Sequence, residues 1–123
     1  MVNKLTYAMV FIEKYEFGRI LIDGRWYTTD VIIYPDRVRE GWWRKHGHRL
    51  LPEDLEEVVE YKPEILVIGN GHDGVMEVPR ETLKYIESKG IKPIVQRTGE
   101  ACKTFNELIK SGKKAVAAFH LTC

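Results

Sequence analysis

The sequence predicts an α/β fold, a single three-layer domain in which antiparallel N-terminal strands are followed by a β-α-β-α-β segment that forms a mixed central sheet. β-Branched and aromatic residues dominate the first third of the chain, where Asp23-Gly24 is a hairpin signal. From Pro52 onward, amphipathic helical patterns alternate with short apolar runs, as in strands covered by helices. The 123 residues, of which 44% are hydrophobic, suit one core, so we expect one domain over residues 1–123.

The first third of the chain is predicted to form strands over residues 7–12, 19–22 and 31–34, separated by glycine-containing turns. Residues 37–51 are polar, aromatic and glycine-bearing, and they show no clear hydrophobic period. We therefore expect a long ordered loop there.

Three helices are expected to begin at Pro52, Pro79 and Thr98, because proline suits a first helical turn and a threonine hydroxyl can cap one. Gly90 is placed to end the second helix. Strands are predicted over residues 65–68, 91–95 and 115–119. Pro93 lacks a ladder donor, which favours a position for its strand at the margin of the sheet.

Charge and composition limit the binding partners and the location that we expect for this protein. The 19 basic and 18 acidic residues give a net charge of +1, which argues against general electrostatic binding to nucleic acid or to a membrane surface. No apolar run approaches the roughly 20 residues that span a bilayer, and the first residues lack the apolar core of a secretory signal. We expect no membrane partner and a cytoplasmic location, with Cys102 and Cys123 as reduced thiols.

The balance of polar residues suggests a thermophilic source. Charged residues make up 30% of the chain, whereas asparagine and glutamine occur only at Asn3, Asn70, Gln96 and Asn106. Many charges with few thermolabile amides are typical of proteins that work at high temperature.

Candidate ligand-binding residues follow the predicted parallel strands, because the crevice of an open α/β sheet lies beyond the carboxyl ends of its strands. They are Gly69, Asn70, Gly71, Arg97, Thr98, Asn106 and His120. The segment 69–74 matches G-x-G-x-x-G, but Pro79 delays the next helix, so the glycines do not open it and a dinucleotide is disfavoured. Loop amides with Arg97 nearby would suit a small anion.

Neither a metal site nor a cofactor is predicted. His46 and His48 have H-x-H spacing, but no carboxylate or thiolate follows at a recognised metal-ligand spacing. Cys102 near a helix start, or Cys123 beside His120, could supply a nucleophile, although packing explains both cysteines as well. The sequence contains no recognisable catalytic arrangement, so enzymatic activity is not favoured, although it is not excluded. If the protein is an enzyme, His120 or His48 is the candidate for proton transfer.

The segment 37–49 alternates cations with aromatic residues. Such a mixture could bind nucleic acid, but it suits a protein interface better, since Trp and Arg dominate interface hot spots. The candidate interaction surface is formed by Trp42, Trp43, Arg44 and His48. We expect Trp42 and Trp43 to be substantially exposed in one chain, where they could bind a protein partner or a second copy.

From about residue 18 onward the chain resembles a family of small domains. The resemblance rests on the order and spacing of Gly24-x-x-Tyr27-x-x-Asp30, Trp43-Arg44, Pro52-x-Asp54, Leu66-Val67-Ile68-Gly69-x-Gly71 and Phe119-His120-x-Thr122-Cys123. The family includes the adipogenesis-associated vertebrate protein and, more distantly, a mitochondrial complex I assembly factor, with archaeal and bacterial members of unassigned activity. The resemblance implies a three-layer fold with a mixed sheet, and no established reaction.

Two functional hypotheses follow. The first is a non-enzymatic interaction or assembly protein that uses the Trp42-Trp43 segment. The alternative is a small-molecule or anion-binding protein, or an unrecognised enzyme, that uses the crevice at the strand ends and requires a concave pocket there.

Overall fold

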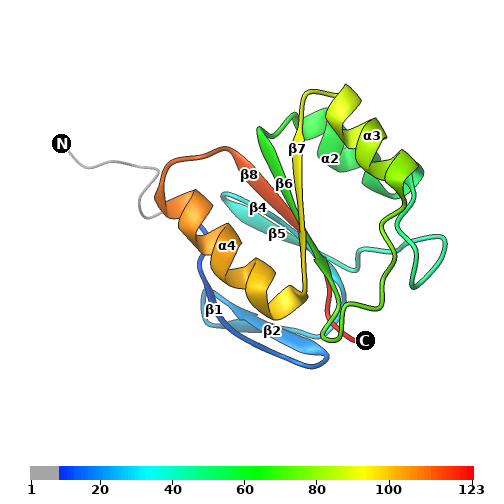
Figure 1. Ribbon diagram of the computed structural model, residues 1–123. Coiled ribbons are helices and arrows are strands. Elements are labelled where there is room, and N and C mark those ends of the chain that lie inside the picture. The colour runs from blue at the N-terminus through cyan, green and yellow to red at the C-terminus, as the bar shows by residue number, and fades with distance from the viewer. Residues whose placement is uncertain (1–8) are drawn as a thin grey trace.

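The computed structural model describes residues 9–123 (Figure 1). Its elements are β1 (Ile12–Glu16), β2 (Arg19–Ile22), β3 (Arg25–Tyr27), β4 (Val31–Tyr34), β5 (Arg37–Glu40), η1 (Pro52–Leu55), α2 (Glu56–Tyr61), β6 (Ile65–Asn70), α3 (Arg80–Ser88), β7 (Lys92–Gln96), α4 (Thr98–Lys110) and β8 (Ala115–His120). The predicted mixed α/β fold is confirmed. The first expected strand, over residues 7–12, lies partly outside the described residues, and β1 begins only at Ile12.

The larger sheet has five strands in the order β5-β4-β8-β6-β7. β6 pairs in parallel with both β7 and β8, whereas β4 pairs antiparallel with β8 and β5. The β6-α3-β7-α4-β8 segment therefore supplies the parallel half of the mixed sheet. Pro93 lies in β7 at the edge of this sheet, as its missing donor predicted.

β1, β2 and β3 form a separate antiparallel sheet. The β2-β3 hairpin turns at Asp23-Gly24, where both residues have positive φ, 50° and 80°. Two left-handed residues match the right-handed twist of the hairpin strands, which is why the Asp-Gly pair is favoured there.

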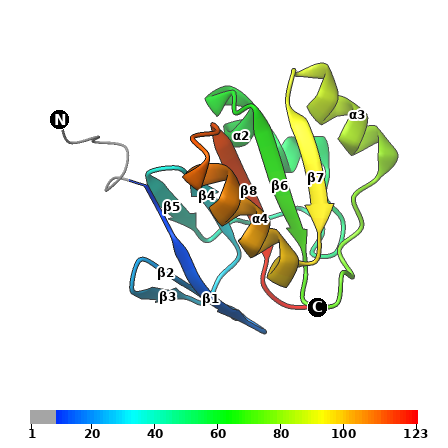
Figure 2. The same ribbon diagram turned by 60° about the vertical axis from the view of Figure 1, so that its left-hand side comes forward.

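The layers follow from the alternation of side chains along the central strands. Val67 of β6 faces a core shared with α4 and the small sheet, whereas Leu66 and Ile68 face a second core shared with α2 and α3. Figures 1 and 2 show α4 and the small sheet on one side of the central sheet and the other helices on the opposite side. Both faces are therefore covered, as the continuous apolar run in β6 requires.

Two local expectations are corrected. Residues 37–40 form the edge strand β5 rather than loop, because each pairs with a residue of β4 although three of the four are exposed. Thr98 is the first residue of α4 and does not cap it, since its hydroxyl donates to the carbonyl of His120.

No helix among residues 9–123 combines the length and the apolar character that crossing a bilayer requires.

Candidate functional site

A buried polar cluster lies at the carboxyl end of β8. The antiparallel register pairs Val31 of β4 with Phe119 of β8, which brings Asp30 beside His120. One carboxylate oxygen of Asp30 lies 2.8 Å from His120 Nδ1 and 2.9 Å from a guanidinium nitrogen of Arg44. Its other oxygen accepts the amide of Leu121 at 2.8 Å. The Arg44 and His120 side chains are 4% and 7% exposed, so their polar atoms depend on one another.

The carboxyl of Asp30 is held in its charged form. Burial alone raises its pKa, but hydrogen bonds from His120 and Leu121, together with the charges of His120 and Arg44, outweigh burial and lower the pKa. His120 Nδ1 lies near two groups: the Asp30 carboxylate at 2.8 Å, which only accepts, and a guanidinium nitrogen of Arg44 at 3.0 Å, which only donates. We assign the imidazole proton to Nδ1, directed at Asp30, because the contact with the carboxylate is the shorter one, and this assignment leaves Nε2 of His120 as an acceptor.

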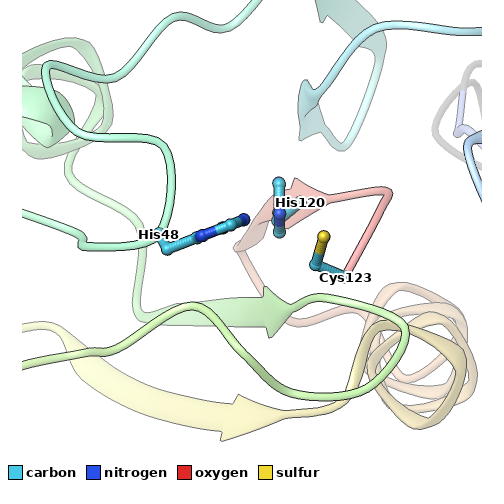
Figure 3. Close-up of side chains that lie close together, drawn as sticks. All are labelled: His48, His120 and Cys123. Carbon is cyan, nitrogen blue, oxygen red and sulfur yellow. The ribbon is translucent and has the colours of Figure 1, made fainter.

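His48 and Cys123 extend this cluster toward solvent. The closest donor atoms of His48, His120 and Cys123 all lie within 4.8 Å of one another. The two imidazole rings meet edge to face at 5.6 Å between centroids. Figure 3 shows the three side chains converging from a loop, from the end of β8 and from the segment that follows it. No spacing in the sequence links these residues.

Hydrogen bonds fix the backbone that carries His48 and Cys123. The Arg44 guanidinium donates to the carbonyl of Gly47 at 2.7 Å, and the backbone amide of Glu77 donates to the carbonyl of His48 at 2.8 Å. The backbone amide of Val75 donates to the carbonyl of Cys123 at 3.1 Å. The same arginine that pairs with Asp30 therefore also holds the turn that presents His48.

Gly69 and Gly71 of the predicted loop pack closely against neighbouring segments, whereas His72 of the same loop lines an open hollow beside β1 and α4. A Cβ on Gly71 would lie 2.6 Å from the carbonyl carbon of Cys123, and one on Gly69 would lie 2.8 Å from Phe119 and Thr98. The Thr98 hydroxyl accepts the amide of Gly71 and donates to the carbonyl of His120. The close approach of two backbone segments thus explains both glycines.

The loop amides expected to bind an anion already have partners within the protein. The amides of residues 71, 72, 74, 75 and 76 donate to Thr98, Thr122, Gly71, Cys123 and Asn70. Asn70 itself keeps a buried side-chain oxygen without a hydrogen bond among residues 9–123. The geometry therefore does not favour anion binding by this loop.

Arg97 lies against the glycine loop, since a Cβ on Gly74 would lie 3.5 Å from both Arg97 Cγ and Asn70 Oδ1, whereas Asn106 lies further along α4. Arg97 and Asn106 both line a hollow of about 510 Å³ between β1 and α4 that Gly69, Gly71 and His120 do not line. Asn106 accepts the amide of Ile12 and donates to its carbonyl, which attaches β1 to α4. The predicted ligand residues therefore do not share one pocket: Arg97 and Asn106 line this hollow, which adjoins the closed contact between the glycine loop, Thr98 and His120.

The predicted interaction surface alternates between buried and exposed residues. Trp42 is 6% exposed and donates its indole N–H to the carbonyl of Asp54, whereas Trp43 is 77% exposed. The expectations that Trp42 is exposed and that Arg44 belongs to a surface are wrong, because this extended segment directs alternate side chains inward. Trp43 and His48 are exposed as expected.

The remaining nucleophile candidate is buried. Cys102 lies in α4 with 6% exposure, and burial raises the pKa of its thiol to about 12. The helix start therefore does not activate this thiol. Both cysteines are free.

Sequence reasoning did not identify Asp30 as part of the site. It occurs in the pattern on which the family resemblance rests, but only the β4-β8 register places it beside His120.

Comparisons with known proteins support the resemblance to an assembly factor. Residues 12–120 match a family described as protein of unknown function (DUF498/DUF598). NADH dehydrogenase [ubiquinone] 1 alpha subcomplex assembly factor 3 of Xenopus tropicalis is 30% identical over 112 residues, which cover 89% of this chain and 60% of that protein. The human protein of the same name is also 30% identical, with 59% of its length covered. The chain therefore spans about 60% of the length of these relatives.

A solved structure agrees with the fold. The conserved hypothetical protein of Pyrococcus horikoshii OT3 is 34% identical, with a TM-score of 0.80 over 91% of this chain and 98% of that one. The likeness to the adipogenesis-associated protein stays a prediction.

Proposed function

This chain belongs to the DUF498/DUF598 family of unknown function, and we propose that it acts as a non-enzymatic protein-binding factor of the assembly type. Its similarity to complex I assembly factor 3 supports a protein partner. The observation that carries the proposal is the exposure of Trp43, which lines a hollow of about 620 Å³.

The residues that line this hollow suit a partner segment with apolar and basic side chains. The buried Trp42 lines it beside Trp43, and η1 and α2 contribute Glu53, Asp54, Glu56, Glu57 and Glu60. Asp54 accepts the amides of Lys45 and Leu51, and Glu57 pairs with Arg39. Within residues 9–123, the exposed Glu56 and Glu60 have no ion pair. These two carboxylates are free to pair with basic residues of a partner.

Burial of one exposed tryptophan can dominate such a contact. Truncation of a hot-spot tryptophan to alanine typically weakens binding by about 2 kcal/mol, which corresponds to about 30-fold in affinity. Charge reversal of Glu60 should reduce the association rate and make binding less sensitive to salt.

The test places a photo-cross-linking amino acid at position 43 or at position 26 of the full chain in cells of the source organism. Trp26 is the matched control, because it is partly exposed in β3 of the small sheet. We expect a defined protein adduct from position 43 only. The purified partner should then bind Trp43→Ala about 30-fold more weakly than Trp26→Ala.

Equal cross-linking from both positions, or unchanged affinity of Trp43→Ala, would contradict the proposal. An adduct between two copies of the chain would identify the partner as a second copy.

A second candidate function is small-molecule binding in the hollow between β1 and α4. Lys14, Arg97 and Lys103 line it together with Glu13 and Glu100. Inorganic phosphate is the probe: a rise in melting temperature with phosphate, absent in Arg97→Ala, would support an anion site there. No rise in either protein would exclude it.

We also propose a cytoplasmic location, which the two free thiols support.

A further inference from the structure

Three side chains with the donor atoms that zinc prefers meet at the carboxyl end of β8. They offer two imidazole nitrogens and one sulfur, with all three atoms within 4.8 Å of one another (Figure 3). Zinc binds nitrogen at about 2.0–2.1 Å and sulfur at about 2.3 Å, so tetrahedral ligands lie about 3.3–3.7 Å apart. A small side-chain adjustment closes the difference.

His120 is already oriented as a metal ligand. Asp30 accepts from Nδ1 at 2.8 Å, which leaves Nε2 on the opposite side of the ring available as a ligand atom. A carboxylate behind a ligating imidazole fixes its tautomer and raises its basicity. Among residues 9–123, the one hydrogen-bonding group near Nε2 is the hydroxyl of Thr122, at 3.5 Å, the limit of a hydrogen bond, so a metal ion would displace little.

His48 is the ligand that can move. Its side chain is exposed and forms no hydrogen bond within residues 9–123, while its backbone carbonyl is held by the amide of Glu77. The imidazole can therefore rotate toward His120 and Cys123 without moving the chain.

Charge does not oppose a cation at this position. Arg44 is paired with Asp30, so the group behind His120 has no net charge. Coordination requires the thiolate, so the Cys123 thiol releases one proton to solvent as its sulfur binds the metal. The ion then carries a net charge of +1 with its three protein ligands.

We propose that His48, His120 and Cys123 form a site for a zinc-type divalent cation, with Asp30 as the residue that orients His120. Three protein ligands leave a fourth tetrahedral position for water or for a group from another molecule. The site departs from the sequence-based expectation of no metal, because its residues come from three segments that only the fold brings together. It does not depend on the Trp43 surface.

Cobalt(II) is the probe, added to the purified, reduced full chain after treatment with a chelator. A thiolate ligand gives a near-ultraviolet charge-transfer band, and tetrahedral cobalt gives visible absorption. We expect both at one cobalt per chain, and we expect zinc to displace them. Cys123→Ser should abolish the charge-transfer band, and His48→Ala should weaken binding at least tenfold.

The matched control is His46→Ala, because His46 is an exposed histidine two residues from His48 and outside the cluster. It should bind cobalt like the unsubstituted chain. Asp30→Asn should weaken binding about 10- to 100-fold while keeping the charge-transfer band, as a positioning residue would. Circular dichroism confirms that each variant is folded.

Any of three results would overturn the proposal: no charge-transfer band with the folded chain, a band that survives in Cys123→Ser, or an equal loss in His46→Ala and His48→Ala. Trp43→Ala should leave cobalt binding unchanged, so failure of the metal site and failure of the protein-binding function are distinguishable.

Discussion

At the scale of single residues, Asp30 neutralises a buried charge. Arg44 has 4% side-chain exposure and pairs with this carboxylate at 2.9 Å. Substitution of one partner in a buried pair leaves an uncompensated charge, which typically costs about 3 kcal/mol or more. We expect Asp30→Asn to lower the free energy of unfolding by about 3 kcal/mol at neutral pH, measured by guanidinium denaturation. Asp36→Asn is the control, because Asp36 forms an exposed pair with Arg37 and should change stability little.

The same residue predicts a pH dependence. The pKa of Asp30 is lower in the folded state, so its carboxylate stabilises the fold above the ordinary carboxyl pKa. This contribution is lost as pH falls through the lowered pKa. The stability difference between Asp30→Asn and the unsubstituted chain should therefore shrink in strong acid, and a difference that stays constant with pH would contradict the electrostatic explanation.

The two cysteines should differ in reactivity. Burial raises the pKa of Cys102 to about 12, whereas Cys123 is half-buried. Because the thiolate is the reactive form, a thiol reagent at pH 8 should label Cys123 and leave Cys102 unlabelled until the chain unfolds. Intact mass with Cys102→Ala and Cys123→Ser assigns each label. Rapid labelling of Cys102 in the folded chain would contradict this prediction, because it would show that the reagent reaches the thiol in α4 without unfolding.

Residue-scale predictions from the sequence failed where side-chain direction was not considered. Trp42 and Arg44 alternate with the exposed Trp43, a period of two within a segment interpreted as loop. The sequence does not show which set faces inward, because Trp43 and Lys45 repeat the same spacing of an aromatic and a cation and are both exposed. The meeting of His48, His120 and Cys123 was not predictable either, because it depends on sheet register and on the course of the C-terminal segment.

At the scale of elements, the glycine loop after β6 should depend on one close backbone contact. Gly71 has φ of +110°, and a Cβ there would lie 2.6 Å from the carbonyl carbon of Cys123. Gly90 also has positive φ, +78°, but no atom lies within 4 Å of its virtual Cβ. Gly90→Ala should therefore cost about 1 kcal/mol, from backbone conformation alone.

Gly71→Ala adds a steric clash to that conformational cost, so we expect it to destabilise the chain by about 3 kcal/mol. Chemical denaturation compares the two variants. Equal costs would show that the C-terminal segment moves aside without loss, and would contradict its tight packing against this loop.

Elements with apolar periodicity were predictable, and elements fixed by pairing were not. The apolar run of β6 and the proline and glycine boundaries around α3 indicated their structures directly. β5 was missed because its exposed Arg37, Arg39 and Glu40 give no apolar alternation. Its strand conformation comes from pairing with β4, a tertiary effect that overrides local propensity.

At the scale of the whole molecule, composition predicts high thermal stability. The sequence has 30% charged residues and four amide side chains, and a Pyrococcus horikoshii protein shares 34% identity and the fold. We expect a melting midpoint above the range of about 45–65 °C that is usual for mesophilic domains. Calorimetry measures it, and a midpoint within that range would contradict a thermophilic source.

The arrangement of the two hydrophobic cores supports the proposal that the chain is one domain. Its two cores share one sheet, since neighbouring residues of β6 face opposite cores, as do Ile32 and Ile33 of β4. If one core unfolded, it would expose one apolar face of the central strands, and the opposite face of the same strands forms part of the other core. We therefore expect both cores to unfold in one cooperative transition.

Tryptophans on opposite sides of the molecule can test this cooperativity. Trp26 lies in the small sheet, whereas Trp42 belongs to the core beside α2 and α3. In Trp42→Phe/Trp43→Phe, the fluorescence of Trp26 should follow the same denaturation curve as far-ultraviolet circular dichroism. In Trp26→Phe, the remaining tryptophans should also coincide with it. Comparison within each variant removes any effect of the substitutions on stability. A separate Trp26 transition at lower denaturant concentration would contradict this cooperativity, because it would mean that β1, β2 and β3 unfold alone. The contacts of the small sheet with α4, including the hydrogen bond of Asn106, would then be weaker than those within the central sheet.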